Sequence, residues 1–146
     1  SGVLDFITTD HSPAPASIKE ITSGNLKKAW GGIAGIQFLL TASWTALKDL
    51  MSLEQFIPLV TSKPAQFLKV DKKGTIAVGN DADIVIWNPS QTQVIQESDI
   101  FFKHKISPYI GQELNGVVLE TIVNGQTVYQ NQIIQNKNKG QWLLRK

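Results

Sequence analysis

The first feature that could do chemistry is a carboxylate beside an imidazole, Asp10 and His11, at the end of a short apolar run. The run covers residues 3–7, which are apolar except for Asp5, and it predicts a short buried strand. Pro13 prevents this strand from continuing as an inner strand. Two ionisable side chains at the end of a buried strand are costly unless a partner or a metal compensates them. Asp10 is therefore the first candidate for a catalytic role.

A glycine-rich stretch, residues 29–35, is the second candidate, because Gly31, Gly32 and Gly35 fall within five positions. Such a backbone must turn sharply or approach another group closely. One interpretation is a loop whose backbone N–H and C=O groups contact a small polar ligand. The alternative is a tightly packed turn that leads into a helix, and the residues alone favour this packed turn.

Helices are expected after these two stretches. From residue 36 to about residue 50, mostly apolar positions recur at helical spacing: Ile36, Leu39, Leu40, Ser43, Leu47 and Leu50. Trp44 lies within reach of the same face. Ser52 and Gln55 form a capping box that starts a second helix, and Pro58 predicts that this helix is kinked or short. Pro64 is expected to open a third short helix that ends at Leu68.

The second half of the chain has β character. Residues 84–87 are rich in β-branched side chains and predict a strand that stops at Pro89, with Asp83 as a turn or cap residue before it. Residues 93–95 predict another short strand. Asn124 and Gly125 lie between two β-prone runs and predict a hairpin with a type I′ turn. We therefore expect two regions, residues 1–70 with a strand and helices and residues 71–146 with mostly strands.

Composition excludes several classes of protein. The formal net charge of +2 is too small to indicate a nucleic-acid or anionic-membrane partner. The absence of cysteine excludes disulfides and thiolate metal sites, and it suits a reducing compartment. The 146 residues fit one domain or two small pieces, and the only methionine is Met51. Because a lone parallel strand cannot bury itself, we expect the chain to be a piece of a longer protein.

The order of several motifs resembles the C-terminal portion of the allantoinases. These belong to the cyclic amidohydrolase family, which also holds dihydroorotases and hydantoinases. The resemblance covers nearly all of residues 3–134, and its motifs lie at residues 9–13, 28–33, 63–65, 74–83, 104–118 and 123–129. The glycine-rich motif at residues 74–83 is common among amidohydrolases, whereas the motifs at residues 29–33 and 104–109 are the most allantoinase-like.

Two positions depart from the family pattern. Ala14 stands where dihydroorotases usually place a substrate-binding histidine, which argues against a dihydroorotase, and where many allantoinases carry cysteine. Lys63 replaces a more usual asparagine before Pro64. His104 matches a family position but lies in a turn region, so we interpret it as structural.

The resemblance implies an α/β fold. Residues 1–70 would be the last strand and helices of a (β/α)₈ barrel, and residues 71–146 the C-terminal part of a small β-sandwich. It also implies a binuclear metal centre, usually zinc, with Asp10 as a metal ligand and general acid/base. Gly31, Gly32 and Ile33 would contact the ring amide of the substrate, and His11 would have an outer or structural role. The full-length protein would be a cytoplasmic homo-oligomer that acts on a small cyclic amide, without nucleic-acid or membrane partners.

The histidine count limits what this chain can do alone. The metal centre that the resemblance implies takes four histidines, a carbamylated lysine and the aspartate, whereas this chain has two histidines and no cysteine. The remaining ligands would have to lie upstream. Allantoin is the expected substrate, and the alternatives are a dihydroorotase- or hydantoinase-type hydrolase, or a non-catalytic scaffold that kept the fold and lost the metals.

Overall fold

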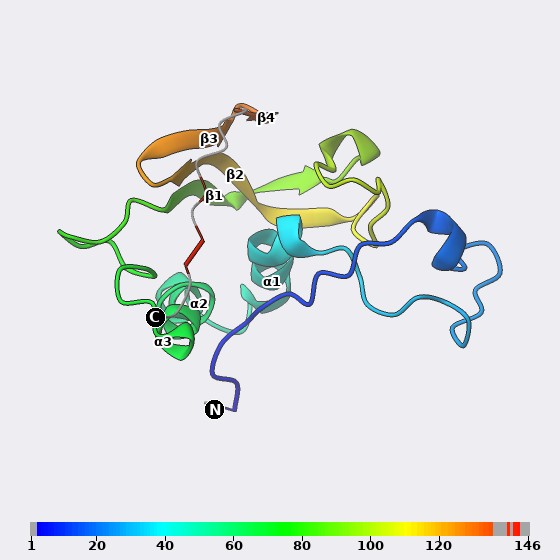
Figure 1. Ribbon diagram of the computed structural model, residues 1–146, viewed down its shortest axis with the longest axis horizontal. Helices are drawn as coiled ribbons and strands as arrows, with labels where there is room; N and C mark the ends of the chain where they lie inside the picture. The colour runs from blue at the N-terminus through cyan, green and yellow to red at the C-terminus, as the bar shows by residue number, and fades with distance from the viewer. Residues whose placement is uncertain (1–2, 136–139, 141, 144–146) are drawn as a thin grey trace.

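A computed structural model describes residues 3–135, 140 and 142–143. In this part of the chain an antiparallel sheet lies over a layer of short helices (Figure 1). The strands follow the order β1 (Ile84–Val94), β2 (Glu113–Val123), β3 (Gln126–Gln130) and β4 (Ile133–Ile134). The helices are α1 (Leu39–Leu47), α2 (Leu53–Val60) and α3 (Ser62–Leu68), and 3₁₀ turns lie at Ala16–Ile18, Ile36–Phe38 and Glu97–Asp99. No helix of the described residues is both long and apolar enough to cross a membrane.

Strand β1 is longer than the sequence predicted. It does not stop at Pro89 but continues to Val94, so the separate strand expected at residues 93–95 is the end of β1. The register between β1 and β2 shifts between Asn88 and Thr92, which places Pro89 inside an irregularity. Strand β1 also lies at the edge of the sheet. Proline is tolerated at edges and bulges because its missing N–H breaks no ladder there.

The predicted hairpin is confirmed. Strands β2 and β3 pair antiparallel, and Val123 faces Gln126 across the turn. Asn124 and Gly125 have φ angles of 51° and 74°, the two positive values that a type I′ turn requires. Asp83 precedes β1 as expected, and its carboxylate accepts a hydrogen bond of 2.7 Å from the Asn124 amide.

The capping box at Ser52 and Gln55 is also confirmed, with hydrogen bonds in both directions between side chain and backbone. Helix α2 contains Pro58 and is short, as predicted, since it ends at Val60. Helix α3 begins at Ser62 rather than at Pro64. Pro64 still lies in the first turn, where its missing N–H needs no partner.

The buried face of α1 differs from the prediction at its two ends, because Ile36 is 57% exposed and Leu50 is 77% exposed. Trp44 is buried, and its ring packs against Trp87 of β1 and Phe56 of α2. Ile36 lies in the 3₁₀ turn of residues 36–38, whose three residues per turn place its side chain differently from an α-helical turn. Leu50 lies beyond the end of α1 at Leu47.

A core cluster connects the helical half with the β half. Phe38 is buried together with Ile95, Ile100 and Leu114, which lie in and between β1 and β2. The cluster therefore draws on both sides of the boundary expected near residue 70. The division into residues 1–70 and 71–146 remains a prediction.

The expected strand at residues 3–7 does not form. Val3 is 81% exposed and Leu4 is 73% exposed, and the segment bends at Asp5 and has no strand pairing. It is attached by a hydrogen bond of 2.9 Å from Ile7 N to Leu59 O and by the ring of Phe6 against that of Phe67. A parallel strand needs at least one neighbouring strand that pairs with its backbone N–H and C=O groups. The described residues contain no parallel strand that could pair with this one.

Replacing Gly116 with alanine is expected to destabilise the sheet. Gly116 has a φ angle of +91°, and an added Cβ would lie 2.5 Å from Cζ3 of Trp87. Gly79 has the same φ angle but open space around it. In Gly79→Ala, therefore, only the strain of a non-glycine residue at a positive φ angle destabilises the protein. We expect Gly116→Ala to lower the free energy of unfolding, measured in urea, by about 1–3 kcal/mol more than Gly79→Ala. Equal losses in the two variants would show that Trp87 does not require glycine.

Candidate functional site

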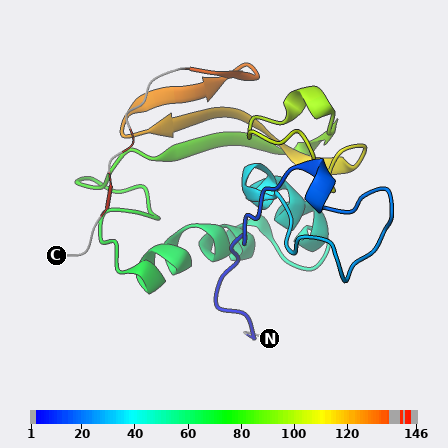
Figure 2. The same cartoon turned by 45° about the vertical axis from the view of Figure 1, so that its right-hand side comes forward.

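The Asp10 turn and the glycine-rich loop lie together. Residues 10–35 form a protruding segment at the end of the molecule opposite α3 (Figures 1 and 2). The backbone of His11 bridges to that of Ile33 in parallel orientation, and Ser12 N donates to Ile33 O over 2.9 Å. The Ser12 hydroxyl donates to Gly31 O over 3.0 Å and accepts from the indole Nε1 of Trp30 over 3.1 Å. The two stretches that the sequence singled out separately thus form one site.

Close packing accounts for one of the three glycines. Gly32 has a φ angle of +72°, and an added Cβ would lie 2.6 Å from Cβ of Ser12. Gly35 is buried, but a Cβ there would lie 3.4 Å from Oγ1 of Thr9, which is an ordinary contact distance. Gly31 has open space where a Cβ would be. Packing therefore explains Gly32, and it leaves the backbone at Gly31 accessible to a ligand.

The Asp10 carboxylate is exposed, which differs from the buried strand end that the sequence indicated. Within the described residues, the structure records neither a hydrogen bond nor an ion pair to this carboxylate. An exposed charge needs no internal compensation. The carboxylate of Asp10 is thus available to a ligand, beside the loop that contains Gly31.

His11 supports the loop. Its Nδ1 accepts a hydrogen bond of 3.3 Å from Ile36 N, and its ring stands edge-on to Phe102 at a centroid distance of 5.4 Å. The segment that contains Phe102 also supplies Ser107, whose hydroxyl donates to Ala34 O over 3.2 Å. His11 and this segment therefore hold the C-terminal end of the glycine-rich loop through Ile36 N and Ala34 O.

Two other residues considered from the sequence lie elsewhere. His104 is partly buried in the connection between β1 and β2, where its carbonyl accepts from Ile106 N over 2.7 Å. Asp83 pairs with Lys73, which also contacts Asp81 over 2.9 Å. The hydrogen bond from Lys73 holds the pKa of Asp83 below its ordinary value. Asp83 therefore serves the start of β1 and the hairpin.

These residues do not form a metal centre by themselves. Across residues 3–135, 140 and 142–143 there is no group of three or more His, Cys, Asp or Glu side chains that could hold a metal ion. Zinc in proteins is bound by at least three such side chains. Within this part of the chain, Asp10 can therefore offer a metal at most one carboxylate.

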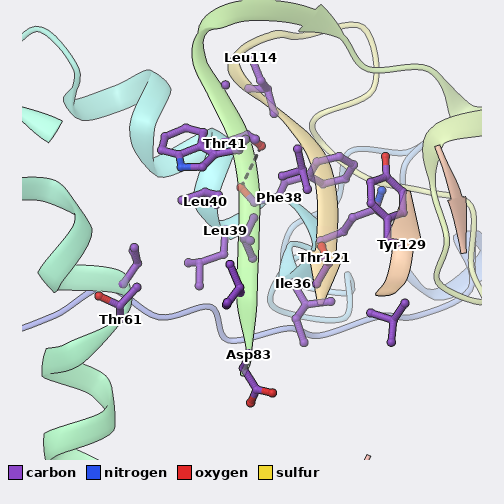
Figure 3. A pocket seen from close by; sticks show the side chains of 18 of the residues that line it. Ile36, Phe38, Leu39, Leu40, Thr41, Thr61, Asp83, Leu114, Thr121 and Tyr129 are labelled. Carbon is purple, nitrogen blue, oxygen red and sulfur yellow. Dashed lines mark hydrogen bonds between the residues drawn. The ribbon is translucent and has the colours of Figure 1, made fainter. Parts of the chain in front are cut away.

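The large cavity of the molecule is separate from this site. It has a volume of about 730 Å³ and lies between the sheet and helices α1 and α2 (Figure 3). Its lining is mostly apolar, and it includes neither Asp10 nor Gly31. Its ionisable lining residues are Asp83, which Lys73 already pairs, and Tyr129, whose pKa is raised by burial. The cavity offers packing surface but no acid or base that is free to react.

Lys19 belongs to the site although the sequence did not single it out. Its ammonium donates to the backbone carbonyls of Ser12 and of the glycine-rich loop, at distances from 2.7 to 3.3 Å. The sequence places it in a polar, irregular segment, and a single lysine there is typical of solvent-exposed surface. No local pattern distinguishes it, because its partners lie 7 to 13 residues away.

Comparison with known proteins places the chain among relatives of one kind. The family model described as "Amidohydrolase family" matches residues 1–128. An allantoinase of Enterococcus faecalis is 37% identical over 131 residues, which are 88% of this chain and 28% of that protein. An allantoinase of Escherichia coli K12 is 36% identical over an alignment of 148 positions, which covers 99% of this chain and 32% of that protein. The chain therefore spans about a third of the length of the curated relatives it matches.

Solved structures give the same fold. A D-hydantoinase superposes with a TM-score of 0.81 at 28% identity, over 91% of this chain and 30% of that one. The L-hydantoinase of Arthrobacter aurescens superposes with a TM-score of 0.82 at 30% identity, over 92% of this chain and 30% of that one. The mixture of helices and antiparallel sheet is thus that of one part of these larger folds.

Proposed function

Because this chain belongs to the amidohydrolase family, we propose that it is the C-terminal part of an enzyme that hydrolyses a cyclic amide. The observation that carries this proposal is the 36–37% identity to allantoinases over 88–99% of the chain. The hydantoinase folds support the same reaction class, since hydantoins are cyclic amides as well.

Allantoin is the proposed substrate, and allantoate is the proposed product, in purine catabolism. The relatives in sequence are named allantoinases, whereas the relatives in structure are named hydantoinases. The motifs at residues 29–33 and 104–109 favour allantoin. A 5-substituted hydantoin is the alternative, and Ala14 argues against dihydroorotate.

Asp10 is proposed to act as general acid/base. Water forms a new C–O bond at the ring carbonyl, and the ring C–N bond breaks. Asp10 takes a proton from the attacking water and returns it to the departing nitrogen. Its carboxylate, which is exposed and has no recorded partner among the residues that the structure describes, is suited to this transfer. The backbone of Gly31, Gly32 and Ile33, which packs against the Asp10 turn, is proposed to contact the ring amide.

A pair of zinc ions is the proposed cofactor of the full-length enzyme. Asp10 would be the ligand from this chain, and all other ligands would come from residues outside it, because the described residues hold no metal cluster. Such ions supply an activated water and polarise a carbonyl. We also propose that the full-length protein is a homo-oligomer and lies in the cytoplasm, a reducing compartment that suits a chain without cysteine.

The test is an assay of the full-length protein that carries this chain. Allantoin, dihydroorotate and a 5-substituted hydantoin are offered in parallel, and the ureido acid produced from each is quantified. We expect the highest kcat/KM for allantoin. Activity on dihydroorotate alone would overturn the proposed substrate, and no ring opening with any of the three would overturn the proposed function.

A further inference from the structure

The ammonium of Lys19 lies among four backbone carbonyls of the candidate site. It contacts Ser12 O at 3.2 Å in the Asp10 turn. It also contacts the carbonyls of three consecutive residues of the glycine-rich loop, Trp30 O at 3.3 Å, Gly31 O at 3.2 Å and Gly32 O at 2.7 Å. An ammonium has three N–H donors, so these four acceptors use its whole capacity. No carboxylate of the described residues pairs with Lys19.

This arrangement fixes the direction of the loop's amides. In a planar trans peptide the C=O and the following N–H point in opposite directions. Since the carbonyls of Trp30 and Gly31 point at the Lys19 ammonium, the amides of Gly31 and Gly32 point away from it. Within the part of the chain that the structure describes, neither of these two amides has a recorded acceptor. Two neighbouring donors are therefore left unpaired on the side of the loop that faces away from the cation.

Glycine makes this orientation dependent on the lysine. Peptides next to glycine can adopt many conformations, because no Cβ restricts them. Three consecutive carbonyls that point toward one place also repel one another unless a cation or donor lies there. Charge-assisted hydrogen bonds are roughly twice as strong as neutral ones. The Lys19 ammonium, aided at Gly31 O by the Ser12 hydroxyl, therefore selects one peptide orientation from the several that Gly31 and Gly32 allow.

We propose that Lys19 is a positioning residue that turns the Gly31 and Gly32 amides outward, where they donate to a ring carbonyl oxygen of the substrate. This proposal rests on the proposed function, because a cyclic amide supplies the carbonyl acceptor. Lys19 acts through the loop and does not touch the reacting atoms. Its loss is therefore expected to weaken substrate binding more than the chemical step.

The test replaces Lys19 with methionine in the full-length protein. We expect KM to rise by about tenfold, the effect of losing one to two hydrogen bonds to the substrate, and kcat to change less. We also expect faster hydrogen exchange at the amides of Ser12 and Trp30, which donate to Ile33 O and Ile18 O. Lys27→Met is the matched control, because Lys27 is exposed in the same protruding segment and its ammonium has no recorded partner among the described residues.

A second variant keeps the test decisive if Lys19→Met does not fold. Lys19→Ala leaves space for propylammonium, which completes the missing part of the side chain, and added propylammonium is expected to restore KM while propanol does not. Faster exchange with KM within about twofold of the wild type would overturn the proposal, since Lys19 would then only fasten the loop. Unchanged exchange and unchanged KM would overturn it as well. If the wild type opens no ring, the proposed function fails separately, and the exchange measurement still decides whether Lys19 orders the loop.

Discussion

Replacing Asp10 with asparagine in the full-length protein is expected to lower kcat/KM for ring opening by about a thousandfold. Asparagine has the shape of aspartate but cannot take a proton from water, and positioned acid/base groups contribute about 10²–10⁴-fold to rates. Because the Asp10 carboxylate is exposed and has no recorded partner among the described residues, the free energy of unfolding of the metal-free protein should change by less than about 0.5 kcal/mol. Steady-state kinetics of the zinc-loaded protein and urea unfolding of the metal-free protein measure the two quantities.

The matched control for this variant is Asp5→Asn. Asp5 is an exposed carboxylate in the same N-terminal segment, and it lies before the Asp10 turn. We expect its removal to leave kcat/KM within about twofold, as for most surface substitutions. Full activity in Asp10→Asn would remove Asp10 from the catalytic machinery, whatever the substrate.

Replacing Gly32 with alanine is expected to have the second largest effect. The added Cβ would lie 2.6 Å from Cβ of Ser12 and 3.1 Å from its hydroxyl oxygen, in a backbone with a φ angle of +72°. The loop and the Asp10 turn must then separate. We expect the free energy of unfolding to fall by about 1–3 kcal/mol, and kcat/KM by about 10²-fold, because misplacement by 1 Å can cost that much.

Gly24→Ala is the control for the backbone cost at Gly32. Gly24 lies in the same protruding segment, has a φ angle of +62°, and has no neighbouring atom where a Cβ would be. We expect this variant to lose about 1 kcal/mol of stability and to keep its activity. If the two alanine variants lost the same activity, the contact between the loop and Ser12 would not position the site.

Features with local causes could be predicted from the sequence. The capping box needs only Ser52 and Gln55, and the type I′ turn needs only Asn124 and Gly125. In both cases the stabilising contacts lie within a few residues, so the residue types determine the geometry. Both predictions are confirmed in position and type.

Features that depend on distant partners could not be predicted. The strand expected at residues 3–7 lacks neighbouring parallel strands in the described residues. Strand β1 passes Pro89 because β2 pairs with it on both sides of an irregularity. Helical spacing placed Trp44 within reach of the buried face of α1, but not its partner Trp87, which lies more than forty residues further along the chain. Periodicity along one helix carries no information about such a partner.

The candidate site was predictable as two separate stretches but not as one site. Asp10 and the glycines stood out by residue type, whereas the hydrogen bond from Ser12 N to Ile33 O joins positions about twenty residues apart. Lys19 was missed for the same physical reason, because only the folded backbone brings its four carbonyl partners together. The roles of Asp10, Gly31, Gly32 and Ile33 in catalysis remain predictions.

We propose that this chain contributes one carboxylate and one loop to a site that other residues complete. The most direct test measures zinc content and allantoin turnover in parallel for the full-length protein and for residues 1–146 alone, with circular dichroism to confirm that the latter are folded. We predict about two zinc ions per chain and ring opening in the full-length protein, and neither in residues 1–146. Stoichiometric zinc together with turnover in residues 1–146 would contradict the claim.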